Sequence, residues 1–146
     1  MDSGEVNGKS RVRLYWILWF FSIVVFFVLR FTVFLSTTQN ARFSLLAAFT
    51  ALLLVFFIVV HVHEYTRLLY YLKVNHRQFW EYLTFKLPLL GHGHITKSHR
   101  VEKFLFSGED FGDPGMALLK SKYRRLLLLS LAAFLVYPFV VLSCVM

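Results

Sequence analysis

The sequence predicts an all-α membrane protein with three transmembrane helices and a short helical cytoplasmic segment between the second and third. Three apolar runs carry this prediction: residues 14–35, 43–60 and 126–146, which are 22, 18 and 21 residues long. A helix needs roughly 20 apolar residues to cross the hydrocarbon core of a bilayer. Because the runs are apolar on all sides, they are typical of helices that face lipid rather than water.

The distribution of basic residues predicts how these helices are oriented. The chain carries 16 Lys and Arg against 8 Asp and Glu, a net charge of +8. Three basic residues precede the first run, one lies in residues 36–42 and eleven lie in residues 63–125. Loops rich in Lys and Arg stay on the cytoplasmic side. We therefore expect a multi-pass protein of the cell inner membrane, with the N-terminus and the long loop cytoplasmic and the C-terminus outside.

The first transmembrane helix follows a short tail. Residues 1–13 are expected to form a cytoplasmic N-terminal tail, residues 14–35 the helix, and residues 36–42 an external loop. An apolar run of 22 residues is too long for the core of a cleavable signal peptide, so the helix is expected to be retained. Arg30 lies near the outer end of this helix, where its long side chain is expected to reach the lipid headgroups.

The second and third transmembrane helices are expected to pack through small residues. The second covers residues 43–62 and continues as a helix to about residue 74, and the third covers residues 126–146. Small side chains at helical spacing let membrane helices approach closely. The predicted packing positions are Ala47 and Ala51 in the second helix and Ser130 and Ala133 in the third.

Residues 63–125 are expected to form a basic, helical, cytoplasmic segment that is too short for a sizeable independent core. Asn75 and Gln78 have the spacing of a capping box, which predicts a helix that ends at Pro88. Phe79 and Trp80 share the apolar face of this helix. That face is expected to lie in the membrane interface, and packing against neighbouring helices is the alternative.

Two further helices are expected later in this segment. Gly91-His92-Gly93-His94 predicts a flexible turn, and a short helix after it ends at Gly108. Asp113 followed by Pro114 is typical of a helix start, with an acidic N-cap and Pro at the first helical position. The helix that begins there is expected to continue unbroken into the third span.

Four basic residues precede the third span: Lys120, Lys122, Arg124 and Arg125. They are expected to bind anionic lipid headgroups, because the cytoplasmic leaflet is negatively charged. The acidic surface of a protein partner is the alternative. Nucleic acid is not expected as a partner, since the basic residues lie at the ends of apolar helices.

Histidines are the candidate metal ligands of the chain. His92, His94 and His99 place three imidazoles close together in the sequence, as in many zinc sites. An ordinary polar loop is the alternative, because no cysteine lies in this segment to complete the set. The spans offer no pair of haem ligands on facing helices, so no cofactor is expected.

The motifs of the common enzyme classes are missing from the sequence. It contains no phosphate-binding glycine loop, no nucleophile elbow and no zincin motif. The three apolar runs contain no Asp or Glu, which argues against a proton relay through the membrane. The protein is therefore expected not to be an enzyme.

A series of motifs covers roughly residues 64–146. They are Tyr65-Thr66-Arg67-Leu68-Leu69, Phe79-Trp80-Glu81-Tyr82-Leu83, the stretch from His99-Arg100 to Phe104-Leu105-Phe106, Asp113-Pro114, and Lys122-Tyr123-Arg124-Arg125 before a terminal span. Their order resembles the small bacterial inner-membrane proteins related to universal stress protein B. The resemblance implies two spans around a cytoplasmic segment and an association with stationary-phase and envelope stress. The first span of this chain is additional to that pattern.

These observations favour a non-enzymatic protein that acts through helix–helix and lipid contacts. The expected role is an accessory or scaffold subunit of a larger membrane complex, in a hetero-complex or a homo-oligomer. The expected partners are other membrane proteins and anionic lipids. Two alternatives remain: a metal- or cofactor-binding membrane protein that uses the loop histidines, and a stand-alone envelope stress protein.

Overall fold

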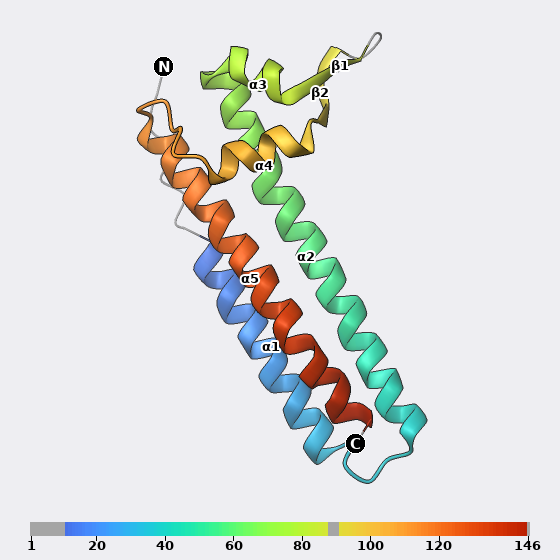
Figure 1. Ribbon diagram of the computed structural model, residues 1–146. Coiled ribbons are helices and arrows are strands. Elements are labelled where there is room, and N and C mark those ends of the chain that lie inside the picture. Colours follow the sequence, from blue (N-terminus) through green and yellow to red (C-terminus); the bar gives the residue numbers. More distant parts are fainter. Residues whose placement is uncertain (1–10, 88–90, 146) are drawn as a thin grey trace. The chain divides into compact units, whose positions relative to one another are not determined.

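The computed structural model describes residues 11–87 and 91–145, and within these ranges every side chain except those of 86, 87, 91–95 and 98 (Figure 1). The elements are, in chain order, α1 (Val12–Thr32), α2 (Gln39–Asn75), α3 (Arg77–Leu83), β1 (Thr84–Leu87), β2 (Gly91–Thr96), α4 (Ser98–Phe106) and α5 (Pro114–Val145). They form two compact units. The helix bundle lies within Met1–Val60 and Arg125–Met146, and the connecting unit is His61–Arg124.

The three longest helices are long and apolar enough to cross a membrane. They are α1 with 21 residues, α2 with 37 and α5 with 32. Both α2 and α5 extend beyond the bundle into the connecting unit. The predicted fold class is therefore confirmed, and the chain is a multi-pass membrane protein.

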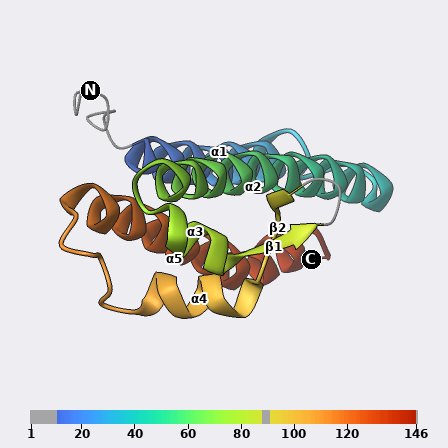
Figure 2. The same ribbon diagram turned by 90° about the horizontal axis from the view of Figure 1, so that it is seen from above.

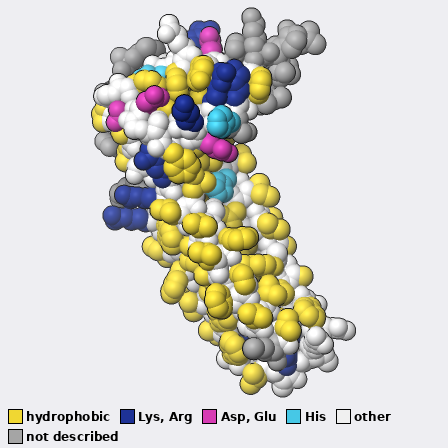
Figure 3. All heavy atoms as spheres, viewed as in Figure 1, with side chains coloured by type: hydrophobic (Ala, Val, Ile, Leu, Met, Phe, Trp, Pro, Cys, Tyr) yellow, Lys and Arg dark blue, Asp and Glu magenta, His cyan; other side chains and the backbone are white. Residues whose placement is uncertain are grey.

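The core of the helix bundle is small and aromatic. Phe26 of α1 and Phe49 of α2 lie with their ring centroids 4.6 Å apart, and Val140 and Cys144 of α5 complete the buried cluster. The Thr50 and Tyr137 hydroxyls share a hydrogen bond of 2.8 Å between α2 and α5. Figure 3 shows hydrophobic side chains over most of the visible face of the bundle. This outward apolar surface suits helices whose solvent is lipid.

The burial of Arg30 contradicts the prediction that its side chain reaches the lipid headgroups. Its side chain is only 3% exposed. Its Nε donates to the Ser143 carbonyl at 2.7 Å, and its Nη1 donates to the Phe34 carbonyl at 3.4 Å. Ser143 lies in the last turn of α5 and Phe34 lies just beyond α1. Carbonyls at helix C-termini lack donors within the helix and carry partial negative charge. Their attraction for the guanidinium outweighs the conformational freedom that the side chain would keep at the surface.

The connecting unit has a core of its own, to which α2, α3, α4 and α5 all contribute. Its buried residues are Leu68, Leu72, Trp80, Leu83, Val101, Phe104, Leu105, Met116 and Leu119. The length of residues 63–125 predicted that this segment would not form a sizeable core of its own. The ends of α2 and α5 supply four of these nine residues (Leu68, Leu72, Met116 and Leu119), which is how a short segment covers an apolar centre.

The helix predicted to run from Asn75 to Pro88 is much shorter in the structure. The Asn75 amide donates to the Tyr71 carbonyl at 3.1 Å, so it closes α2 and does not cap α3. The N-cap position of α3 is His76, which makes no side-chain cap bond. α3 ends at Leu83, and the chain continues directly into a strand because Thr84 and Phe85 favour extended backbone.

The Gly-His-Gly-His stretch, predicted as a flexible turn, belongs instead to a strand. β1 and β2 form an antiparallel pair in which Thr84 lies opposite Thr96 and Leu87 opposite Gly91. The Thr84 hydroxyl also donates to the Trp80 carbonyl at 2.9 Å, which fixes the hairpin to the last turn of α3. Figure 2 shows α3 leading into the hairpin and the hairpin into α4.

Candidate functional site

Asp113 joins the end of α2 to the start of α5. Its Oδ1 accepts the backbone N–H groups of Gly115 at 2.8 Å and Met116 at 3.3 Å, as the predicted helix cap requires. Its Oδ2 accepts the Tyr71 hydroxyl at 2.8 Å and lies 3.0 Å from Nε2 of His76. Burial alone would raise the pKa of Asp113, but the hydrogen bonds from His76, Tyr71 and the two backbone groups lower that pKa below its ordinary value of 3.8.

The turn before Asp113 brings an aromatic ring onto His76. Phe111 has a φ of 58°, a left-handed conformation that is uncommon for a residue with a bulky side chain. Its ring stacks on the imidazole of His76 with centroids 4.8 Å apart and meets the Phe79 ring at 4.9 Å. A Cβ at Gly115 would collide with the Tyr71 hydroxyl, so a larger residue there would displace this hydroxyl from Asp113.

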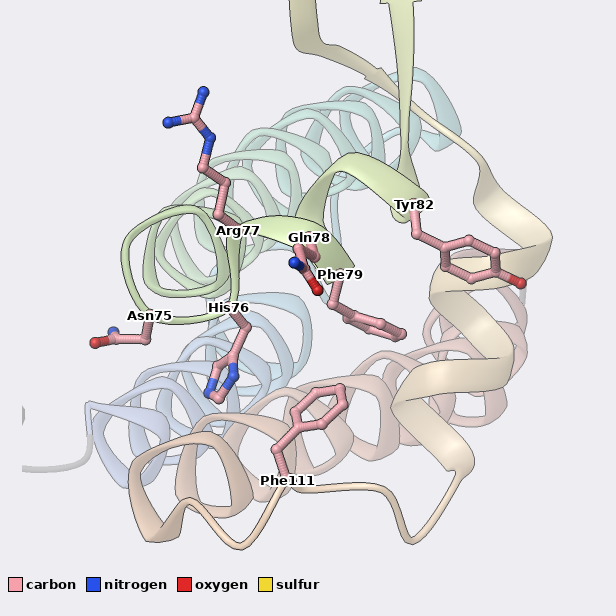
Figure 4. A pocket seen from close by; sticks show the side chains of 7 residues that line it. All are labelled: Asn75, His76, Arg77, Gln78, Phe79, Tyr82 and Phe111. Carbon is pink, nitrogen blue, oxygen red and sulfur yellow. The ribbon is translucent and has the colours of Figure 1, made fainter.

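These residues border an open recess of about 570 Å³. Its lining comprises Asn75, His76, Arg77, Gln78, Phe79, Tyr82 and Phe111. Figure 4 shows the rings of His76, Phe79 and Phe111 turned toward one another, whereas the Asn75 and Arg77 side chains point away. An Asp–His pair is also found in nucleophilic catalysis, but no Ser, Thr or Cys is among the described residues that line this recess. The hydrogen bonds of Asp113 to Tyr71, His76 and Gly115 tie the end of α2 to the start of α5.

A second recess, of about 270 Å³, shares Phe79 and Tyr82 with the first as lining residues. α4 supplies three basic residues to it: His99, Arg100 and Lys103. The rings of Phe79, Tyr82 and Phe104 form its apolar wall, and Ser107 and Glu109 complete the lining. This recess combines positive charge with aromatic surface, a combination that suits an anionic ligand with an apolar part.

Trp80 is buried within the protein, whereas the sequence predicted an outward face directed at the membrane interface. Its side chain is 8% exposed and belongs to the core of the connecting unit. Phe79 is half-buried against the same core. Lys73 places its ammonium 5.4 Å from the Trp80 ring. Both residues fit the alternative, in which this short helix packs against its neighbours. The other helices of the unit form the apolar core that buries Trp80.

The basic residues before the third span also differ from the expectation. Lys120 and Lys122 are 3% and 5% exposed. Lys120 donates to the Ser107 and Glu109 carbonyls at 3.0 and 2.7 Å, and Arg124 donates to the Leu105 and Ser107 carbonyls at 2.6 and 2.8 Å. These carbonyls end α4 and begin the turn after it, where donors are lacking. Of the four predicted lipid-binding residues, Arg125 alone is exposed.

The predicted histidine site lies largely outside the described side chains. His99 is exposed on α4. His92 and His94 belong to β2, but their side chains are not among those described. Within the described part of the chain, no three His, Cys, Asp or Glu side chains come together as metal ligands.

The small residues predicted to mediate helix packing differ in how far the bundle of this chain buries them. Ala47 and Ala51 are exposed on α2, whereas Ser130 and Ala133 are half-buried on α5. The Ser130 hydroxyl donates to the Leu126 carbonyl at 3.2 Å. Large side chains of α2, such as Phe49, fill the contact within the bundle. The pair on α2 therefore faces outward.

In comparisons with known proteins, no family model, no curated protein and no solved structure matches this chain. The resemblance to proteins related to universal stress protein B stays a prediction. Sequence reasoning missed Tyr71, His76 and Phe111 as partners around Asp113. The Asp-Pro helix start was the only signal of this site, because the partners come from an α2 end and a turn that no motif marks.

Proposed function

We propose that the protein is a non-enzymatic accessory or scaffold subunit of a larger membrane complex, acting through helix–helix and lipid contacts. In this proposal it resides in the inner membrane of a bacterial cell. Its N-terminus and connecting unit are cytoplasmic and its C-terminus is outside. A role in envelope stress follows only from the resemblance to proteins related to universal stress protein B.

The outward face of α2 is the observation that carries this proposal. Ala47 and Ala51 form a small-xxx-small pair one turn apart, and both are exposed. Leu54 and Ile58 continue the same stripe along the helix and are 60% and 62% exposed. Small-xxx-small pairs let a second membrane helix approach closely, and the bundle of this chain leaves the pair uncovered. A helix from another membrane protein, or from a second copy, fits this stripe.

The use of charged groups in the connecting unit supports a non-enzymatic role. Asp113 accepts hydrogen bonds on both carboxylate oxygens. Lys120 and Arg124 are committed to backbone carbonyls at the end of α4. Groups held in this way hold helices in place, whereas a general acid or base needs a proton site directed at a substrate.

The charge distribution supports the proposed orientation. Residues 63–125 contain eleven Lys and Arg, and the loop at residues 36–42 contains one. The positive-inside rule depends on loop charge during insertion and is independent of the later burial of Lys120 or Lys122.

Site-specific photo-crosslinking in cells tests the proposal. A photoreactive amino acid at Leu54 is expected to capture one defined membrane protein, or a second copy of this chain. The same group at Phe139 of α5, which is 66% exposed, is the matched lipid-facing control and is expected to give no discrete adduct.

Two Ala substitutions sharpen this experiment. Ala51→Leu is expected to abolish the Leu54 adduct, because the larger side chain blocks close helix approach. Ala48→Leu, also on the exposed surface of α2, is expected to preserve it. If Leu54 gave no adduct, or the same diffuse pattern as Phe139, the accessory role would fail.

A further inference from the structure

The recess beside α4 is surrounded by more positive than negative groups. Arg100 and Lys103 line it from neighbouring positions on one face of α4, and His99 adjoins them. The Lys120 and Arg124 side chains both donate to the carbonyl of Ser107, another lining residue. The acids nearby are Glu109, which lines the recess, and Asp110, whose charge acts on Lys120. Four Lys and Arg thus outweigh two carboxylates.

The two rim cations differ in how firmly they are held. Nη1 of Arg100 donates to the Tyr82 carbonyl at 3.1 Å, and its guanidinium lies 4.2 Å from the centre of the Tyr82 ring. This fixes the plane of the guanidinium at the mouth of the recess and leaves other N–H groups of the fork for a ligand. Lys103 is exposed, and its ammonium makes no hydrogen bond or ion pair with the described residues. One hydrogen-bonded cation and one exposed cation therefore line the same recess.

Three aromatic rings, those of Phe79, Tyr82 and Phe104, also line the recess. The Phe79 ring lies 4.7 Å from that of Phe104 and 5.7 Å from that of Tyr82. The ammonium of Lys120 lies 4.2 Å from the centre of the Phe104 ring. Walls of low polarity reduce the screening of nearby charges, so the positive potential inside such a recess exceeds that of the same cations on an open surface.

We propose that this recess binds a phosphoryl group attached to an apolar moiety. The phosphoryl oxygens bind the Arg100 guanidinium and the Lys103 ammonium, since Arg offers a planar fork and Lys a compact charge to phosphate. The apolar moiety lies against Phe79, Tyr82 and Phe104. The ligand is either a phospholipid headgroup or a soluble phosphate ester, because both present this chemistry. The site goes beyond the proposed accessory role, and its failure would leave that role untouched.

Phosphorus NMR on the full chain in a maltoside detergent, which contains no phosphorus, tests the site. Phenyl phosphate is the soluble probe and dihexanoyl-phosphatidylglycerol the lipid probe, each titrated while its line width is followed. Lys103→Gln is expected to weaken binding roughly tenfold, the effect of losing one hydrogen bond to a charged group. Lys73→Gln removes an exposed lysine outside the recess and is expected to leave binding unchanged.

Each outcome decides the proposal. Lys103-dependent binding of phenyl phosphate identifies a soluble phosphate ester, and Lys103-dependent binding of the lipid probe alone identifies a headgroup. Binding of neither probe overturns the site, as does an equal loss in Lys103→Gln and Lys73→Gln. Tighter binding of benzoate than of phenyl phosphate would overturn the phosphoryl assignment. Unchanged circular dichroism of Lys103→Gln shows that any loss is not a loss of fold, as the exposure of Lys103 leads us to expect.

Discussion

Four of the described charged side chains act at the ends of helices. Arg30 donates to carbonyls at the ends of α1 and α5, Lys120 and Arg124 donate to carbonyls at the end of α4, and Asp113 caps the start of α5. Helix ends leave backbone groups without partners, and a buried unpaired carbonyl is costly. Positions that resemble lipid-binding residues in the sequence are therefore used to complete the fold.

Asp113→Asn is expected to destabilise the connecting unit at neutral pH and not in acid. Because its hydrogen bonds lower the pKa of Asp113, the ionised carboxylate stabilises the folded state fully above 3.8, and this contribution is lost as the pH falls below that value. At pH 7 the variant should lose about 1–2 kcal/mol, since hydrogen bonds to a charged group are replaced by weaker ones.

Thermal unfolding in detergent at several pH values measures this difference. The gap between the wild-type protein and Asp113→Asn should narrow as the pH falls below 3.8, and Glu102→Gln, an exposed change on α4, should show little gap at any pH. A constant gap from pH 7 to pH 3 would contradict the assignment of Asp113 as the ionised tether.

Arg30→Met is expected to destabilise the helix bundle by about 1–3 kcal/mol, because the Ser143 and Phe34 carbonyls lose their donor in a buried place. Unfolding by SDS titration measures the change. Arg13→Met, an exposed arginine in the first turn of α1, is the matched control and should have little effect. Equal stability of the two variants would favour a surface position for Arg30.

At the scale of elements, the C-terminal end of α4 is held by side chains of another helix. Its C-terminal carbonyls are satisfied by Lys120 and Arg124, which lie on α5. Lys120→Gln is expected to raise hydrogen exchange at residues 98–106 several-fold, because a shorter neutral side chain no longer reaches the turn after α4. Arg125→Gln removes the neighbouring exposed charge and should leave this exchange unaltered. Faster exchange in both variants would point to a general charge effect.

The short helix α3 gives a second prediction at this scale. In a variant with Trp16 and Trp19 replaced by Phe, Trp80 is the one remaining tryptophan. Its fluorescence should resist both aqueous quenchers and shallow lipid-borne quenchers, because its side chain is 8% exposed within the core of the connecting unit. Strong quenching from lipid would restore the interfacial position that the sequence predicted for this helix.

Elements with a strong local signal were predictable, and those decided by tertiary contacts were not. The start of α5 follows from Asp113-Pro114, and its unbroken course follows from apolar spacing. The hairpin was missed because Gly and His at alternating positions have low strand preference, and pairing with β1 decides their conformation. The partners of Asp113 were missed because Tyr71 and His76 are distant in sequence and belong to no motif.

For the whole molecule, length and hydropathy were sufficient to predict three membrane helices, since the bilayer imposes a minimum apolar length. The connecting unit was harder to predict, because part of its core comes from α2 and α5. In the sequence these two helices are recognisable mainly as membrane spans. Charge patterns predict an orientation for the spans, and they were misleading about individual contacts. Lys120 counts toward the positive loop and yet is 3% exposed.

The topology of the chain in cells tests the central claim most directly. Paired reporters, one active only in the cytoplasm and one only outside it, are fused after Asn40, after Gly93 and after Met146. The three-span account predicts an outside signal at Asn40 and Met146 and a cytoplasmic signal at Gly93. A cytoplasmic signal at Met146 together with a cytoplasmic signal at Gly93 would contradict it, because α5 would then fail to cross the membrane.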